Sequence, residues 1–97
     1  MKDYNYYIAL LKQFKSKFAG KYGILKIGIF GSVARGEQKE GSDLDIFVEL
    51  KEADPYLMFD LQSDLEKLCN CSIDLIRLRK SLRPLLLNKI KEEGIYA

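Results

Sequence analysis

The sequence GSVARGEQKEGSDLDIFVEL, residues 31 to 50, decides the fold of this chain. Its first part, GSVARGEQKEGS, contains three glycines and two serines without apolar periodicity, which predicts a loop with one helical turn after Ser32. Its second part, LDIFVEL at residues 44 to 50, predicts a strand, and ILKIGIF at residues 24 to 30 predicts another. Because only a short loop separates the two strands, we expect them to pair antiparallel.

Two aspartates stand two residues apart where the second strand begins. Alternate residues of a strand point to the same side, so Asp43 and Asp45 are expected to project together. Leu44, Ile46 and Val48 then face the core on the opposite side. Two ionised carboxylates about 4 Å apart repel by roughly 4 kcal/mol at an effective dielectric constant of 20, so the pair calls for a divalent cation or a shared proton. Hard oxygen ligands with room for water and phosphate suit magnesium.

A third aspartate, Asp74, lies in the run SIDLIRL, which predicts a third strand. An ionised carboxylate in an apolar run is costly to bury unless it is paired or bound to a metal. If the second and third strands are neighbours, the three carboxylates share one sheet edge and can bridge two metal ions for an in-line displacement. The plainer alternatives are an ion pair of Asp74 with Arg77 or Arg79, and a solvated loop end for the other two aspartates.

Gly31 and Ser32 follow the first strand directly. A glycine lets the backbone approach a phosphate, the serine hydroxyl adds a donor, and Arg35 can reach another phosphate oxygen with its planar fork. The alternative is a plain turn, because glycine and serine are common turn residues. The segment matches neither G-x-x-x-x-G-K-[ST], since no lysine–serine pair follows Gly36, nor G-x-G-x-x-G, since Val33 stands at the third position.

Helices are expected around these strands. Their predicted ranges are residues 3 to 19, 54 to 69 and 81 to 94. Gly20 is the expected stop of the first helix, Asp54 followed by Pro55 the start of the second, and Ser81 the cap of the last. The fold class is therefore α/β or α+β, with a small mixed sheet flanked by helices. The helix between the second and third strands permits a parallel crossover.

Composition narrows the possible functions. With 97 residues, 47% of them hydrophobic, the chain is expected to form a single domain over residues 1 to 97. Its charges are interspersed and sum to +2, so direct nucleic-acid binding is not expected. No apolar stretch is long enough for a membrane span or a signal peptide, so we expect a cytoplasmic protein.

The absence of histidine restricts the chemistry. Histidine triads and histidine metal sites are excluded, which leaves carboxylates, hydroxyls, lysine, arginine and bound metal. Cys69 and Cys71 lack the partners of a structural zinc site and are expected to be reduced, partly buried thiols.

Taken together, Gly31-Ser32, ten intervening residues and Asp43-Leu44-Asp45 resemble the signature of the DNA polymerase beta type nucleotidyltransferases. The stretch from residue 31 to 50, the third aspartate in SIDLIRL and the small size resemble the minimal nucleotidyltransferase (MNT) domains more narrowly. These domains are the antitoxin halves of HEPN/MNT toxin–antitoxin pairs. The resemblance covers nearly the whole chain, from the first helix to EEGIYA at its end.

The resemblance implies a polymerase beta-like fold with ATP and two magnesium ions as ligands. Gly31, Ser32, Arg35 and Ser42 would then bind the nucleotide. The aspartates Asp43, Asp45 and Asp74 would hold the metals, and Asp74 would also help to deprotonate the acceptor hydroxyl. An intact set of aspartates argues against an inactive member.

The resemblance also implies a partner. Nothing follows Ala97 to form an acceptor-binding domain, so a partner protein or a second copy of the chain is expected to complete the site. In the related antitoxins AMP is transferred to a tyrosine of a HEPN-type toxin. Two alternatives stay open: a nucleotide-binding antitoxin that masks the toxin by contact, and a nucleotidyltransferase acting on a small molecule or a nucleic acid end.

Overall fold

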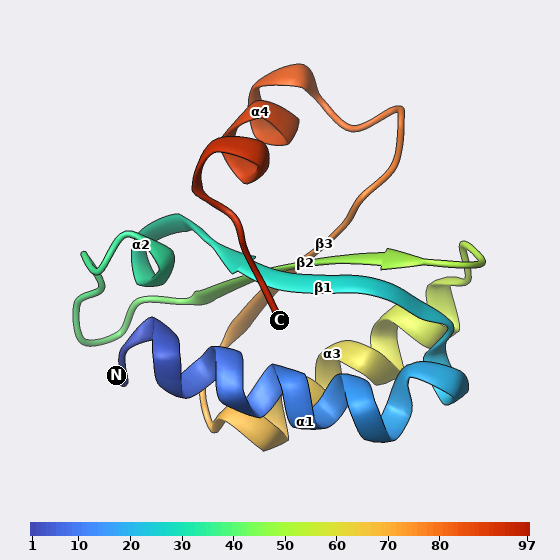
Figure 1. Cartoon of the computed structure of the whole chain (residues 1–97), viewed down its shortest axis with the longest axis horizontal. Helices are drawn as coiled ribbons and strands as arrows, with labels where there is room; N and C mark the ends of the chain where they lie inside the picture. Colours follow the sequence, from blue (N-terminus) through green and yellow to red (C-terminus); the bar gives the residue numbers. More distant parts are fainter.

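The computed structural model describes residues 1 to 97 and shows three layers around a mixed sheet (Figure 1). The strands are ordered β3-β2-β1-β4 across the sheet. The helices α1 and α3 cover one face, and α4 lies against the other face. In chain order the elements are α1 (Tyr4–Tyr22), β1 (Ile24–Phe30), α2 (Gly31–Ala34), β2 (Leu44–Leu50), α3 (Pro55–Cys69), β3 (Ile73–Arg77), α4 (Pro84–Glu93) and β4 (Ile95–Tyr96). No helix combines the length and apolar character needed to cross a bilayer.

The strand pairing confirms the predicted mixed sheet. β1 and β2 pair antiparallel, with Ile29 opposite Ile46, as the short loop between them favours. β2 and β3 pair parallel, because α3 carries the chain back across the sheet. The two-residue strand β4 was not predicted, and it adds an antiparallel edge to β1 through Gly28 and Tyr96.

The main core lies between the sheet and the helix pair α1 and α3. Its most buried members are aliphatic and have no exposed surface: Leu11, Ile27, Ile29, Val33, Leu44, Ile46, Val48, Leu61 and Leu65. The predicted inward positions of β2 are therefore confirmed. On the opposite face of the sheet, a smaller core of Phe30, Phe47, Leu82 and Ile90 seats α4. The residues of β2 that point to α4 are the ones that alternate with the main core, and Asp45 is among them.

The predicted stop of α1 at Gly20 is wrong. The helix continues to Tyr22 and ends at Gly23, whose φ of 66° and amide bond to the Ala19 carbonyl form the cap. Gly20 lies on the exposed side, where a missing side chain costs little packing. Tyr22 explains the extra turn, because its ring is buried and its hydroxyl donates a hydrogen bond to Asp64 of α3.

Of the two other predicted helix starts, one is confirmed and one is wrong. The predicted start of α3 is confirmed, since the Asp54 carboxylate accepts a hydrogen bond of 2.9 Å from the Tyr56 amide. The predicted cap of α4 at Ser81 is wrong, because the helix begins at Pro84 with Arg83 in the capping position. Ser81 lies instead in a turn that brings Leu82 into the smaller core.

Both cysteines are free thiols, as expected. Cys69 is buried at the end of α3, and burial raises its pKa to about 12. Cys71 is half-buried, and burial is also the main reason that its pKa is raised.

Candidate active site

Asp45 and Asp74 lie on the α4 face of the sheet, where β2 and β3 begin, and Asp43 directly precedes β2. Asp45 is the second residue of β2, and its register partner on the parallel strand β3 is Asp74. Both alternate with residues of the main core, so they share the face that carries Phe47 and Ile76. Asp43 comes directly before β2, two positions from Asp45, and is exposed to solvent like Asp74.

The electrostatics show that these carboxylates act on one another. Partial burial raises the pKa of Asp45 above its ordinary value, and the negative charges of Asp74 and Asp43 raise it further. The positive charges of Lys89 and Arg35 oppose the shift only in part. No hydrogen bond from the protein reaches the Asp45 carboxylate, so only these two more distant charges offset its burial.

The simpler interpretation of Asp74, as the ion-pair partner of an arginine, is not what the structure shows. The chain holds three ion pairs and none involves Asp74. Arg79 instead donates a hydrogen bond of 3.2 Å to the Arg77 carbonyl. Asp74 is therefore an unpaired carboxylate beside a second one.

The donor set suits a hard divalent cation. Only carboxylate oxygens are present, their mutual repulsion favours a positive charge between them, and two of the three side chains are open to solvent. As the side chains lie, no group of three histidine, cysteine or acidic residues is arranged closely enough to hold a metal ion. The roles of Asp43, Asp45 and Asp74 as metal ligands stay a prediction.

Gly31 is the point where the turn after β1 approaches the acidic residues. β1 ends at Phe30, and Gly31 then takes a left-handed backbone with a φ of 76°, which opens the helical turn α2. A β-carbon at this position would collide with the Asp45 carboxylate. Glycine is therefore required both by the backbone conformation and by the neighbouring side chain. Ser32 follows at the same turn and is half-buried.

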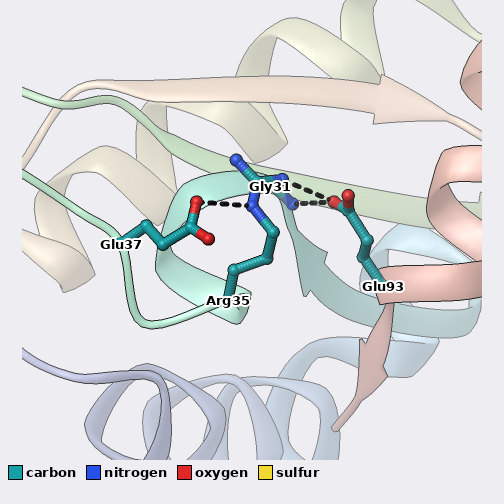
Figure 2. A network of polar contacts seen from close by, with 4 residues as sticks. All are labelled: Gly31, Arg35, Glu37 and Glu93. Carbon is teal, nitrogen blue, oxygen red and sulfur yellow. Dashed lines mark hydrogen bonds and ion pairs between the residues drawn. The ribbon is translucent and has the colours of Figure 1, made fainter.

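Arg35 lies at the end of this turn and is held by two carboxylates (Figure 2). Its Nε donates to Glu37 at 3.0 Å, and its Nη1 donates to Oε2 of Glu93 at 2.8 Å. The same Oε2 of Glu93 accepts a hydrogen bond of 3.3 Å from the Gly31 amide. Two of the groups predicted to hold phosphate are thus bound to one carboxylate oxygen of α4.

Sequence reasoning missed Glu93. It stands in the run KEEG beside Glu92, and no local pattern distinguishes the two residues. Its partners Arg35 and Gly31 lie 58 and 62 positions away in the chain. Only the placement of α4 on the sheet reveals the contact.

Ser42, the remaining predicted residue, directly precedes Asp43. Its hydroxyl accepts a hydrogen bond of 3.0 Å from the Lys39 amide, and its own amide donates to the Lys39 carbonyl at the same distance. These bonds close the turn that leads into β2. Its predicted contact with the nucleotide stays a prediction.

Known proteins share this architecture and sequence. The family model described as "Polymerase beta, Nucleotidyltransferase" matches residues 12 to 96. The chain is 35% identical over 89 residues to the "Protein adenylyltransferase MntA" of Thermococcus cleftensis, covering 91% of this chain and 89% of that protein. It is 47% identical over 68 residues to the "Putative protein adenylyltransferase MJ1215" of Methanocaldococcus jannaschii, covering 69% and 79%.

Solved structures show the same fold. A structure described as "putative minimal nucleotidyltransferase" superposes with a TM-score of 0.77 at 28% identity, covering 97% of this chain and 95% of the other. A toxin–antitoxin crystal structure with AMP-PNP gives a TM-score of 0.71 at 24% identity, covering 88% of this chain and 70% of that one. The predicted polymerase beta-like fold is confirmed.

Proposed function

Because the chain belongs to the polymerase beta nucleotidyltransferase family, we propose that it is a protein adenylyltransferase, which transfers AMP from ATP to a hydroxyl group of a partner protein. One observation supports the proposal: Asp45 and Asp74 lie side by side on one sheet face beside the turn at Gly31, and the charge of Asp43, directly before β2, acts on Asp45. Transfer of a nucleotidyl group needs hydrogen-bond donors to the phosphates next to carboxylates that can hold metal. Gly31 meets this need, because its backbone lies directly against the Asp45 carboxylate.

In this proposal the turn after β1 holds the triphosphate. The Gly31 amide and the Ser32 hydroxyl donate to phosphate oxygens, and the Arg35 guanidinium neutralises part of their charge. Ser42 lies at the opposite end of the loop, next to Asp43, and is proposed to help close the site around the nucleotide. A fixed triphosphate places the α-phosphorus in line with an incoming oxygen, which accelerates the reaction through orientation.

The aspartates supply the negative charge that a metal site requires. Asp43, Asp45 and Asp74 would hold magnesium, and two ions are the number that the family resemblance implies. When bound, magnesium lowers the pKa of the acceptor hydroxyl and neutralises the departing pyrophosphate. Asp74 is exposed, so it is accessible to an acceptor and is proposed to take up the hydroxyl proton. The acceptor oxygen then bonds to the α-phosphorus while the bond to the β-phosphate oxygen breaks.

The proposed acceptor is a tyrosine of a HEPN-type toxin, with this chain as its antitoxin. Support comes from the relatives that are named protein adenylyltransferases and from the toxin–antitoxin structure with AMP-PNP. The exposure of Asp43 and Asp74 leaves the carboxylates open to a large substrate. Residues 1 to 97 would act as one nucleotidyltransferase domain that uses the partner's surface as its acceptor site.

Co-expression with a HEPN-type toxin tests the proposal. Mass spectrometry of the toxin is expected to show added AMP with the native chain and with Glu40→Gln, a control on an exposed loop carboxylate without a partner. Asp45→Asn is expected to abolish the modification while the two proteins still co-purify. A toxin that is neutralised but carries no AMP would refute transfer and favour masking by contact.

A further inference from the structure

Glu93 occupies the position where the proposed function requires a phosphate. We propose that the Glu93 carboxylate is a built-in competitor of the nucleotide: it holds the Gly31 amide and Arg35 in the ligand-free protein and must swing away before a phosphate can use them. This inference rests on the proposed function, and it adds a regulation of the same site that the family signature does not contain.

The contact uses the donors in the way that a phosphate oxygen would use them. A single oxygen, Oε2 of Glu93, accepts from the Gly31 amide at 3.3 Å and from Nη1 of Arg35 at 2.8 Å (Figure 2). A backbone amide carries one proton and makes one good hydrogen bond, so Glu93 and a phosphate cannot both be bound to it. The two acceptors therefore exclude each other at Gly31.

Charge strengthens the competition. The guanidinium of Arg35 is shared between Glu37 and Glu93, so its single positive charge is already compensated before any anion arrives. Glu93 is the more enclosed of these partners, with 22% of its side chain exposed against 64% for Glu37. Its removal should therefore release more attraction for a phosphate than the removal of Glu37.

The fold allows the side chain to leave while the backbone stays. Glu93 is the last residue of α4, and β4 follows after Gly94 and is paired to β1. A β-carbon on Gly94 would press against the Ile90 carbonyl and Phe47, which shows how closely the backbone is packed here. The glutamate side chain, by contrast, has three rotatable bonds and partial access to solvent, so rotation is the expected movement.

The opposite role would be a brace, in which Glu93 orients Arg35 toward the phosphate and stays in place. The two roles differ in sign. If Glu93 competes, neutralising it tightens nucleotide binding, whereas if it braces Arg35, neutralising it weakens binding. The bond to the Gly31 amide favours competition, because a brace for Arg35 has no need of that amide.

Calorimetric titration with Mg-ATP distinguishes them. Glu93→Gln keeps the shape and removes the charge, and Glu92→Gln is the matched control on the exposed neighbour. We expect the dissociation constant to fall by about three- to tenfold in Glu93→Gln, the range for losing one partly exposed charged hydrogen bond, and to stay unchanged in Glu92→Gln. Glu93→Ala should shift it in the same direction.

The background variant Arg35→Gln makes the test specific. There, Glu93→Gln should bring a smaller gain, because one of the two contested donors is gone. Native protein that binds Mg-ATP, with an equal or higher dissociation constant in a folded Glu93→Gln variant, would overturn the competition and leave the proposed function standing. If neither protein binds Mg-ATP, both the proposed function and this inference fail.

Discussion

Asp45→Asn should make the ligand-free protein more stable, although most substitutions in a folded domain destabilise it. The native carboxylate is partly buried, accepts no hydrogen bond and faces the charges of Asp74 and Asp43. An asparagine of the same shape removes the charge and breaks no contact. The variant therefore relieves a strain that the site carries when it holds no cation.

The magnitude follows from the strand register. Asp45 and Asp74 are direct neighbours on adjacent parallel strands, whose separation of about 4.8 Å places the carboxylates roughly 5 Å apart. Their repulsion at that distance lies between about 0.8 kcal/mol in water and about 3 kcal/mol at an effective dielectric constant of 20. Because Asp74 is exposed, we take a value near 1 kcal/mol, which corresponds to a rise in melting temperature of about 4–8 °C for a domain of this size.

The effect has a defined dependence on pH. The pKa of Asp45 is raised in the folded protein, so its contribution to stability is fully present below the ordinary value of about 3.9 and is lost as the pH rises through the raised value. The difference between variant and native protein should therefore be small near pH 3.5 and fully developed at pH 7. Thermal melts followed by circular dichroism over this range measure it, with Glu40→Gln as the control. A melting temperature at pH 7 that is equal to or below the native value would refute the electrostatic description of the site.

Three further outcomes are expected. Gly31→Ala should lower the free energy of unfolding by at least about 1 kcal/mol and abolish Mg-ATP binding. The reason is that alanine disfavours the left-handed backbone and its β-carbon meets the Asp45 carboxylate. Urea unfolding measures the first effect and calorimetric titration the second. Tyr22→Phe should cost about 1 kcal/mol through the lost hydrogen bond to Asp64, whereas Tyr56→Phe, which is exposed, should leave the melting temperature unchanged. Cys69, with a pKa of about 12, should resist a thiol reagent at pH 8 until urea unfolds the chain, and fast labelling of native protein would contradict its burial.

The parts of the fold that were predictable are those with local causes. The start of α3 is encoded by Asp54 and Pro55, which form a cap within a few residues of one another. The end of α1 was misplaced because Gly20 resembles a stop, while the residue that extends the helix, Tyr22, is held by α3 some forty positions away. β4 was missed for the same reason, since two residues have no periodicity and gain their structure only by pairing with β1.

The residues of the site also differ in how far the sequence predicts their positions. Strand alternation placed Asp45 on the face opposite Leu44 and Ile46, and the parallel crossover brought Asp74 beside it, whereas the shared side of Asp43 stays a prediction. Glu93 could not be found in this way, because its contact depends on how α4 lies across the sheet. Positions that follow from strand alternation can be predicted from the sequence, whereas contacts that form only through packing cannot.

Asp45 and Glu93 have opposite effects at the same site. Asp45 forms no ion pair and faces two like charges, which destabilises the fold, whereas Glu93 forms an ion pair with Arg35, which stabilises it. The magnesium of Mg-ATP would supply a positive charge beside Asp45, and the phosphates would take the hydrogen-bond donors that Glu93 occupies. Asp45→Asn is therefore expected to gain stability and lose nucleotide affinity, and Glu93→Gln to lose stability and gain affinity. Stability and binding then oppose each other at both positions, but in opposite senses: Asp45 favours the ligand at the expense of the empty fold, and Glu93 favours the empty fold at the expense of the ligand.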